Sequence, residues 1–263
     1  MGKVVIQMKH LFDQLHGLED LRLGAILLFD YDGTLTPIVE RPELAVLHPG
    51  MRKLLRSLVK HYKVAIISGR SLADIKKMVG PAGIYYAGNH GFEISGPKTR
   101  LALPQAKCAR PTIHKICREL KSMSRGIEGV IIEDKGVTAS VHYRLVARSK
   151  IKILKETFNE VVKPYVRSGG VRVTVGKKVF EIRPNVEWDK GRAVLWIINV
   201  ADPKKKLIPL YFGDDQTDED AFLALKDKGV TVLVSKKQKK SHAKFFLRDV
   251  GEVKMFLEKL VGV

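Results

Sequence analysis

Five apolar runs of strand length alternate with stretches of helical spacing along this chain, and this alternation limits the possible folds more than any other feature of the sequence. The runs are AILLFDYD, KVAIISGR, IYYAGNHG, LIPLYFGDD and VTVLVS, which begin at residues 25, 63, 84, 207 and 230. The stretches between them include GMRKLLRSLVKHY and DEDAFLALKDKG. This order is typical of a parallel sheet with helices on both faces, so the sequence predicts an α/β fold with a doubly wound, Rossmann-like core.

Residues 106–185 have a different pattern. The segments GVIIEDKGVTASVHYR and VRVTVGKKVFEIRP each break at a Lys/Gly turn between strands that alternate apolar and polar residues, which is typical of a hairpin. A helical stretch precedes each of them, the second being SKIKILKETFNEVV. We therefore expect an inserted α+β domain of order αββαββ at 106–185, open on one face, over a core formed by 1–105 and 186–263.

Polar, reactive residues stand at the ends of four of the five runs. Sites in open α/β sheets form outside the carboxyl ends of the strands, so we expect these residues to converge. Paired carboxylates repel each other unless a cation is shared between them, and a dense set of oxygen ligands suits Mg²⁺. Gly33 allows a sharp turn, and Thr34 offers a hydroxyl and an amide to an anion. The residues that end the runs are Asp30, Asp32, Ser68, Arg70, Asn89, His90, Asp214 and Asp215.

Four motifs in sequence order make the chain resemble a known superfamily. DYDGT, which begins at Asp30, resembles the first motif of the haloacid dehalogenase-superfamily phosphatases. SGR at Ser68, the lone lysine of EWDKG at Lys190 and GDDQTDEDAF from Gly213 follow in the expected order. The longer forms FDYDGTLTPI, VAIISGRS, AGNHGFEI and GDDQTDEDAF, with an αββαββ insert after the second motif, closely resemble the trehalose-6-phosphate phosphatases. The resemblance covers residues 25–260.

This resemblance implies a phosphatase reaction at the core motifs. Asp30 would attack phosphorus and form an aspartyl-phosphate, with a metal removing the charge repulsion. Asp32 would protonate the leaving sugar oxygen and then take a proton from the hydrolytic water. Ser68 and the backbone around Thr34 would bind the phosphoryl oxygens, and Lys190 would neutralise charge on nucleophile and phosphoryl group.

The resemblance also implies the metal site and the substrate contacts. Asp30, Asp214 and the carbonyl of Asp32 would hold Mg²⁺, while Asp215 and Asp218 would orient waters and loops around it. Substrate choice would rest with the insert, because the core motifs handle only phosphate and metal. Closure of the insert over the core would exclude water. The expected substrate contacts are Thr34, Gly69, Arg70, Asn89 and His90 in the core, and Glu133, Lys135, Arg144, Lys177, Lys178, Glu181, Arg183 and Asn185 in the insert.

Each assignment has a competing interpretation. Ser68 is also a candidate N-cap of the following helix, and Glu219 and Asp220 fit favourable charges in the first turn of a helix. The charged residues of the insert also fit cross-strand ion pairs on a solvent-facing sheet. For function, the alternatives are a phosphatase of another sugar phosphate, such as sucrose 6-phosphate or mannosyl-3-phosphoglycerate, and a nucleic-acid-binding or regulatory protein on an inactive phosphatase scaffold. The second alternative predicts lost motif residues, yet the motif residues are present.

The core motifs do not require the formal net charge of +19, which fits either a solvated surface or a face that attracts anions. The densest basic cluster, SKKQKKSHAK at 235–244, contains no aromatic residue that would stack on a base, so we do not expect nucleic acid as a partner. Cys108 and Cys117 show no metal-ligand spacing, and we expect both to be packing residues on a helix. No apolar run reaches the roughly 18 residues of a spanning helix. We expect a cytoplasmic monomer that binds a small sugar phosphate, and a trehalose-6-phosphate synthase is a candidate protein partner.

Overall fold

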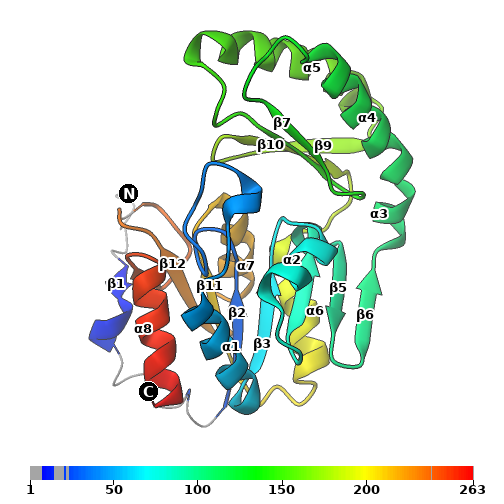
Figure 1. Cartoon of the computed structure of the whole chain (residues 1–263). Helices are drawn as coiled ribbons and strands as arrows, with labels where there is room; N and C mark the ends of the chain where they lie inside the picture. Colours follow the sequence, from blue (N-terminus) through cyan, green and yellow to red (C-terminus); the bar gives the residue numbers. More distant parts are fainter. Residues whose placement is uncertain (1–7, 15–20, 22–23, 238, 263) are drawn as a thin grey trace, which may run out of the picture. The chain divides into compact units, whose positions relative to one another are not determined.

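The computed structural model describes residues 8–14, 21, 24–237 and 239–262, and these fall into two compact units. The core unit comprises the described residues of Met1–Arg100 and Trp188–Val263, and the insert unit comprises Leu101–Glu187. Parallel strands dominate the core unit and the insert unit has an antiparallel sheet of its own, which confirms the predicted fold class (Figure 1).

A single sheet runs through the core unit. In the described residues it has nine strands in the order β1-β13-β12-β11-β2-β3-β4-β5-β6. From β1 to β4 all neighbours are parallel, and β5 pairs with β4 in the antiparallel direction. The strands are β1 (Lys9–His10), β2 (Ala25–Phe29), β3 (Lys63–Ile67), β4 (Tyr85–Gly88), β5 (Glu93–Gly96), β6 (Thr99–Ala102), β11 (Ile208–Gly213), β12 (Val230–Val234) and β13 (Phe245–Leu247).

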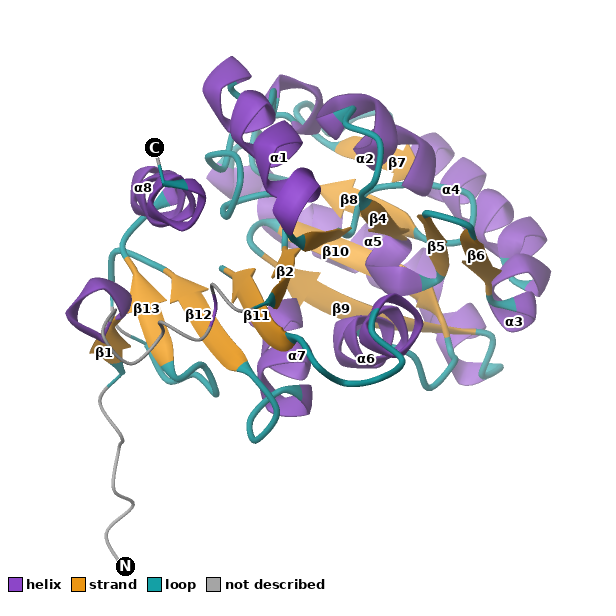
Figure 2. Ribbon diagram, turned by 90° about the horizontal axis from the view of Figure 1, so that it is seen from below, coloured by secondary structure: helices purple, strands orange, loops and turns teal. Residues whose placement is uncertain are grey.

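Helices cover both faces of this sheet, as predicted. Helices α1, α2 and α8 pack on one face, and α6 and α7 lie on the other (Figure 2). Because β2, β3 and β11 are buried on both faces, their sequences are continuous apolar runs rather than alternating ones. The helices are α1 (Pro49–His61), α2 (Leu72–Val79), α6 (Lys190–Ala201), α7 (Glu219–Ala224) and α8 (Val250–Val261).

Some elements of the core unit differ from the sequence prediction. The strands β5 and β6 extend the sheet beyond β4, although the sequence analysis identified no strand in this region. Helix α7 ends at Ala224, well before the end of the helical stretch expected over 218–229. Its first turn carries Glu219 and Asp220, where acidic side chains favour the helix start.

The insert unit has the order αββαββ, preceded by the short helix α3 (Pro104–Cys108). Its sheet order is β7-β8-β10-β9 with antiparallel neighbours throughout. Its hydrophobic core lies between α4, α5 and the sheet residues Ala139, Val141, Phe180 and Ile182. The elements are α4 (Arg110–Met123), β7 (Ile131–Asp134), β8 (Ala139–His142), α5 (Ile151–Arg167), β9 (Val171–Gly176) and β10 (Val179–Pro184).

The two cysteines occupy different environments. Cys117 is buried in the core of the insert unit, as predicted. Cys108 is exposed at the end of α3, so the prediction that it is a packing residue was wrong. Cys108 and Cys117 also lie on two consecutive helices rather than on one. In the described part of the chain, none of the helices has both the length and the apolar character needed to cross a membrane.

Candidate active site

Asp30 lies directly after β2 at the carboxyl edge of the core sheet. Its backbone N–H donates to the carbonyl of Phe212 on the neighbouring β11 at 2.9 Å, which extends the ladder between these two strands by one bond. The residue is 5% exposed, and its Oδ1 accepts a hydrogen bond from Lys190 Nζ at 2.6 Å. Two residues 160 positions apart in sequence therefore meet in one buried ion pair.

Lys190 is positioned by the start of α6. Asp189 caps this helix by accepting from the backbone N–H of Arg192 at 2.8 Å, and Lys190 is the first helical residue. Gly191 allows α6 to approach α7 closely, because a Cβ at this position would lie 2.5 Å from the carbonyl oxygen of Asp220. The sequence DKG thus places a lysine that is only 2% exposed beside the end of β2.

Asp218 organises the group around Lys190. Its Oδ1 accepts from Lys190 Nζ at 2.8 Å and from the Tyr211 hydroxyl at 2.7 Å. Its Oδ2 accepts from the backbone N–H groups of Asp214 at 2.9 Å and Asp215 at 3.0 Å. Four donors use the acceptor positions that a carboxylate offers. Asp218 therefore fixes Lys190 and the backbone of the 214–215 loop.

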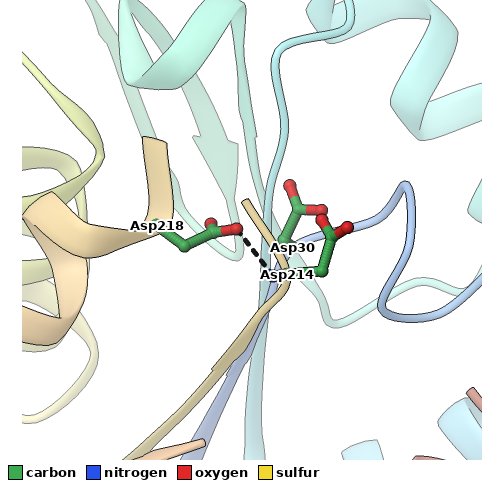
Figure 3. A group of neighbouring side chains, drawn as sticks. All are labelled: Asp30, Asp214 and Asp218. Atoms are coloured by element: carbon green, nitrogen blue, oxygen red, sulfur yellow. Dashed lines mark hydrogen bonds between the residues drawn. The ribbon is translucent and has the colours of Figure 1, made fainter. Parts of the chain in front are cut away.

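The oxygens of three aspartates lie close enough to hold a metal ion. One oxygen each from Asp30, Asp214 and Asp218 lies within 4.8 Å of the others. Figure 3 shows the Asp30 and Asp214 carboxylates side by side, with Asp218 bonded to the backbone of Asp214. Gly33, with φ +92°, packs directly against the Asp214 carboxylate. A Cβ at this position would lie 2.3 Å from Asp214 Oδ2, so the site requires a glycine here. Since protein donors already fill the oxygens of Asp218, the carboxylates that best fit as Mg²⁺ ligands are those of Asp30 and Asp214.

The electrostatics of this group also fit a cation. Burial raises the pKa of Asp30 well above its ordinary value; Lys190 opposes this rise, and Asp218 and Asp214 add to it. Burial opposes the charge of Lys190, yet Asp218 and Asp30 hold the pKa of this lysine well above its ordinary value. Several carboxylates around one lysine leave excess negative charge, which a bound divalent cation would offset.

Asp215 caps the short 3₁₀ turn Gln216–Asp218. Its Oδ1 accepts from both the backbone N–H and the hydroxyl of Thr217, each at 2.7 Å. Burial acts to raise the pKa of Asp215, but Lys190 and the Thr217 hydrogen bonds outweigh it and lower that pKa. Asp215 thus stays ionised and orders the loop that carries Asp214.

Asp32 is held by an arginine rather than standing free. Arg70 donates from Nε to Asp32 Oδ2 at 2.8 Å and from Nη2 to Oδ1 at 2.7 Å, so the pair is bidentate. Arg70 Nη2 also donates to the carbonyl of Pro42 at 2.8 Å. The sequence analysis expected Arg70 to contact substrate, and in this structure its guanidinium contacts Asp32.

The loop after β3 lies beside the end of β4. Asn89 N–H donates to the carbonyl of Arg70 at 2.6 Å, and His90 N–H donates to that of Ser68 at 2.9 Å. Asn89 and His90 both have positive φ, which turns the chain sharply here. Gly69 lies inside this loop, between the two bonded carbonyls.

The N-cap interpretation of Ser68 was wrong. Helix α2 is capped by Ser71, which accepts from the backbone N–H of Asp74 at 3.1 Å. Ser68 Oγ instead accepts from the backbone N–H of Arg70 at 3.1 Å within the loop.

Thr34 contributes a buried polar atom to the turn after β2. The residue is completely buried, and its Oγ1 has no hydrogen-bond partner among the described residues. Buried hydroxyls are rarely left in this state, so Thr34 Oγ1 fits a site that receives a polar ligand.

On the insert unit, the sheet face opposite α4 and α5 carries a charged network. Glu133 on β7 and Glu181 on β10 are both in register with Ser140 on β8, so the three side chains lie on one face. Lys135 Nζ lies 3.8 Å from a carboxylate oxygen of each glutamate. Arg183, which is 4% exposed, donates from Nε to Glu181 at 3.1 Å. Four of the predicted substrate contacts are therefore brought together.

The other candidates of the insert unit lie apart from this network. Lys177 and Lys178 form the turn between β9 and β10, and Arg144 Nη2 donates to the carbonyl of Lys177 at 2.8 Å. Lys178 Nζ lies 5.8 Å from the ring centroid of Tyr143, within the range of a cation–π contact. Asn185 donates from Nδ2 to the carbonyl of Gly169 at 3.1 Å, at the far end of β10.

The sequence analysis missed two polar residues that contact the candidate sites. Tyr211 lies in the apolar run of β11 and donates its hydroxyl to Asp218. The only sign of this role in the sequence was a hydroxyl group within a strand buried on both faces. His142 Nε2 lies 3.2 Å from Glu133, on the same face as Ser140. Strand alternation predicts that shared face, but not the contact.

Known proteins resemble the chain over most of its length. The family model described as trehalose-phosphatase matches residues 28–251. A probable trehalose-phosphate phosphatase D of Arabidopsis thaliana is 36% identical over 249 residues, covering 90% of this chain and 67% of that protein. The trehalose 6-phosphate phosphatase RA3 of Zea mays is 36% identical over 254 residues, covering 90% of this chain and 70% of that protein. The chain thus spans about two thirds of the length of these relatives.

A solved structure shows the same arrangement of elements. The C-terminal domain of the trehalose-6-phosphate phosphatase of C. albicans superposes with a TM-score of 0.82 at 26% identity, covering 97% of this chain and 99% of that chain. A trehalose-6-phosphate phosphatase related protein gives a TM-score of 0.78 at 25% identity, with coverages of 90% and 97%.

Proposed function

The chain belongs to the trehalose-phosphatase family and is a phosphoric monoester hydrolase, and from this premise we propose that it hydrolyses trehalose 6-phosphate to trehalose and phosphate in an Mg²⁺-dependent reaction. The observation that carries the proposal is the buried contact of Lys190 with Asp30, beside Asp214 and Gly33. This arrangement supplies a nucleophilic carboxylate, a fixed positive charge and a set of oxygen ligands in one place.

In the first half-reaction, an Asp30 oxygen attacks phosphorus in line with the sugar oxygen. The bond from Asp30 to phosphorus forms as the bond from phosphorus to the sugar oxygen breaks. Asp32 donates a proton to the leaving oxygen, and trehalose departs. Lys190 stays bonded to Asp30 and Asp218 and offsets the charge on the transferring group.

In the second half-reaction, water attacks the phosphorus of the aspartyl-phosphate. Asp32, now ionised, takes a proton from this water, so one residue serves first as acid and then as base. The bond between Asp30 and phosphorus breaks, and inorganic phosphate leaves. Both oxygens of Asp32 accept from Arg70, so this contact must open at one oxygen while Asp32 donates its O–H to the leaving group.

The bound Mg²⁺ would supply positive charge that lets the anionic phosphate approach Asp30. We propose Asp30, Asp214 and the backbone carbonyl of Asp32 as its protein ligands, with Asp218 and Asp215 holding the loop. Thr34 Oγ1, Ser68 Oγ and the backbone of the turn after β2 are proposed to bind the phosphoryl oxygens. The unpartnered hydroxyl of Thr34 supports this assignment.

The charged network of the insert unit is proposed to bind the sugar. Glu133 and Glu181 are acceptors for sugar hydroxyls, and Lys135 is a donor. Their shared sheet face and the cations between them support a joint role. In this proposal the insert residues distinguish trehalose 6-phosphate from other sugar phosphates, because the core motifs bind only the phosphate group and the metal.

The decisive experiment measures phosphate release by the purified protein with Mg²⁺. The substrates are trehalose 6-phosphate, sucrose 6-phosphate, glucose 6-phosphate and an aryl phosphate, with Asp30→Asn as the inactive control. We expect a preference for trehalose 6-phosphate by orders of magnitude, and no release by the variant. Equal rates on all substrates would contradict the sugar assignment, and an active Asp30→Asn protein would contradict the nucleophile.

The covalent step has its own measurement. Quenching the reaction in acid during turnover should trap a phosphorylated peptide that contains Asp30, detected by mass spectrometry as a phosphoryl mass on that peptide. A single-turnover reaction that never populates this adduct, even in Asp32→Asn protein, would instead support direct attack by water.

A further inference from the structure

The basic segment, residues 235–244, leaves the core sheet at the carboxyl end of β12 and returns to the amino end of that strand, where Lys244 Nζ donates to the carbonyl of Gly229 at 2.8 Å. It connects β12 to β13, and β12 runs parallel to β11, which in turn runs parallel to β2 (Figure 2). The carboxyl ends of these strands therefore face the same side, on which Asp30 and Asp214 lie. The lysines of this segment in the described residues are Lys236, Lys237, Lys239, Lys240 and Lys244.

Lys239 and His242 attach the basic segment to the loops of the candidate site. Lys239 Nζ donates to the backbone carbonyl of Asp214 at 2.8 Å. The backbone N–H of His242 donates to Glu219 Oε2 at 2.8 Å, at the start of α7. The segment is thus fixed beside the proposed metal ligand, although it comes from a different strand connection.

The side chains of the candidate site carry an excess of negative charge. Five aspartates (Asp30, Asp32, Asp214, Asp215 and Asp218) lie beside the cations Lys190, Arg70 and Lys239, which leaves two negative charges when all five aspartates are ionised. A divalent cation would balance these two charges. A phosphate monoester carries up to two negative charges at neutral pH, so the site itself has no net positive charge with which to attract its substrate at a distance.

We propose that the basic segment captures the anionic phosphate monoester and directs it to the catalytic edge of the core sheet. This inference rests on the phosphatase activity and not on the identity of the sugar. Lys239 anchors the segment at Asp214, and the exposed lysines Lys236, Lys237 and Lys240 of the same connection supply positive charge. Fixed charge near a site raises the association rate of an oppositely charged ligand, and salt screens the effect.

The sequence offers a matched control at the opposite edge of the sheet. Lys204 and Lys206 are exposed in the connection that enters β11 at Ile208, whereas Lys239 of the basic segment contacts Asp214, where β11 has left the sheet at Gly213. At about 3.3 Å per residue, the strand separates the two clusters by roughly 17 Å or more. The two clusters therefore allow the same change in net charge at two distances from the site.

The experiment compares Lys237→Gln/Lys240→Gln with Lys204→Gln/Lys206→Gln and the wild type. Steady-state hydrolysis of p-nitrophenyl phosphate is measured with Mg²⁺ between about 25 and 300 mM NaCl, which spans Debye lengths from well above to well below 10 Å. Calorimetric titration with tungstate, a phosphate mimic, gives the anion affinity without turnover. Lys239 is left in place because it anchors the segment.

We expect the Lys237→Gln/Lys240→Gln protein to lose about threefold in kcat/KM and in tungstate affinity at low salt, the loss expected when two screened unit charges near a dianion are removed. Its kcat should be unchanged and the loss should vanish at high salt, while the control double variant behaves as wild type. Equal losses in both double variants, no loss in either, or a loss that persists at high salt would each overturn the proposal. The aryl phosphate has no sugar, so these outcomes do not depend on trehalose 6-phosphate being the substrate.

Discussion

Both carboxylate oxygens of Asp32 are bonded to the guanidinium of Arg70, at 2.8 Å from Nε and 2.7 Å from Nη2. The same guanidinium donates to the carbonyl of Pro42, so it joins the proposed acid–base residue to the loop that follows the turn after β2. The orientation of Asp32 is therefore set by a residue of the SGR motif.

Replacing Arg70 by lysine should lower kcat by on the order of tenfold, because an ammonium group cannot hold two carboxylate oxygens in a planar fork. KM for the aryl phosphate should change little. Arg52→Lys is the matched control, since Arg52 donates to the Met78 carbonyl and not to Asp32. Steady-state kinetics check this prediction, and a rise in KM at constant kcat would assign Arg70 to substrate binding instead.

Gly33→Ala should abolish Mg²⁺-dependent activity. The added Cβ would lie 2.3 Å from Asp214 Oδ2, and φ is +92°, so the carboxylate and the turn would both have to shift. Gly83→Ala is the control, since it has φ +86° but its nearest atom lies at 3.8 Å. Both variants should lose about 1 kcal/mol of stability from backbone strain, and only Gly33→Ala should lose activity. Urea unfolding and a Mg²⁺ titration of activity measure the two effects.

Glu133→Gln and Glu181→Gln should each raise KM for trehalose 6-phosphate by about tenfold, the loss expected for a charge-assisted hydrogen bond, while leaving hydrolysis of the aryl phosphate unchanged. Glu160→Gln on the exposed surface of α5 is the control. Unchanged KM in both variants would favour the alternative in which these residues form only cross-strand ion pairs. Thermal melts must accompany the kinetics, because Glu181 is a partner of the buried Arg183.

Only one thiol should react with Ellman's reagent at pH 8 in the native protein. Burial raises the pKa of Cys117 to about 12, so its thiolate is scarce, whereas Cys108 is exposed at the end of α3. Both thiols should react in denaturant. The native Cys108→Ser protein should not react with Ellman's reagent. Rapid labelling of that variant would show that the insert core opens readily.

The stability of the core unit should fall as the pH rises above about 10, the ordinary pKa of tyrosine. Burial raises the pKa of Tyr31 to about 12, and burial also raises those of Tyr86 and Tyr211. The unfolded chain then loses its tyrosine protons at a lower pH than the native state, so alkali favours unfolding. Urea unfolding between pH 8 and 11 should show this slope. Tyr86→Phe should lessen it, since that variant removes one buried hydroxyl and its bond to the Pro81 carbonyl.

The main strands and the order of the insert could be predicted from the sequence because their signals are local. Strands buried on both faces give continuous apolar runs, and the hairpins of the insert give alternation broken by a turn. The strands β5 and β6 gave no such signal. Each has four residues, and only Ile94 among them is buried, so neither alternation nor an apolar run was present to detect.

The candidate site could be predicted only at the level of which strand ends meet. Ser68 and Ser71 both precede α2, and either serine is a good cap by residue type. The choice between them depends on the path of the loop, which the end of β4 fixes through backbone bonds. Likewise, the pairing of Arg70 with Asp32 depends on side-chain rotamers, and no spacing in the sequence encodes it.

The hydrophobic core between the core sheet and α1, α2 and α8 shares no residue with the one between α4, α5 and the insert sheet. Cooperativity in unfolding comes from shared packing, so we expect each unit to have a free energy of unfolding of its own. A melting curve recorded over the whole chain should then contain two transitions. The residues proposed for chemistry belong to one transition and those proposed for sugar recognition to the other, and a destabilising substitution in the insert can thus silence hydrolysis of the natural substrate while the folded core still cleaves a simple phosphate ester.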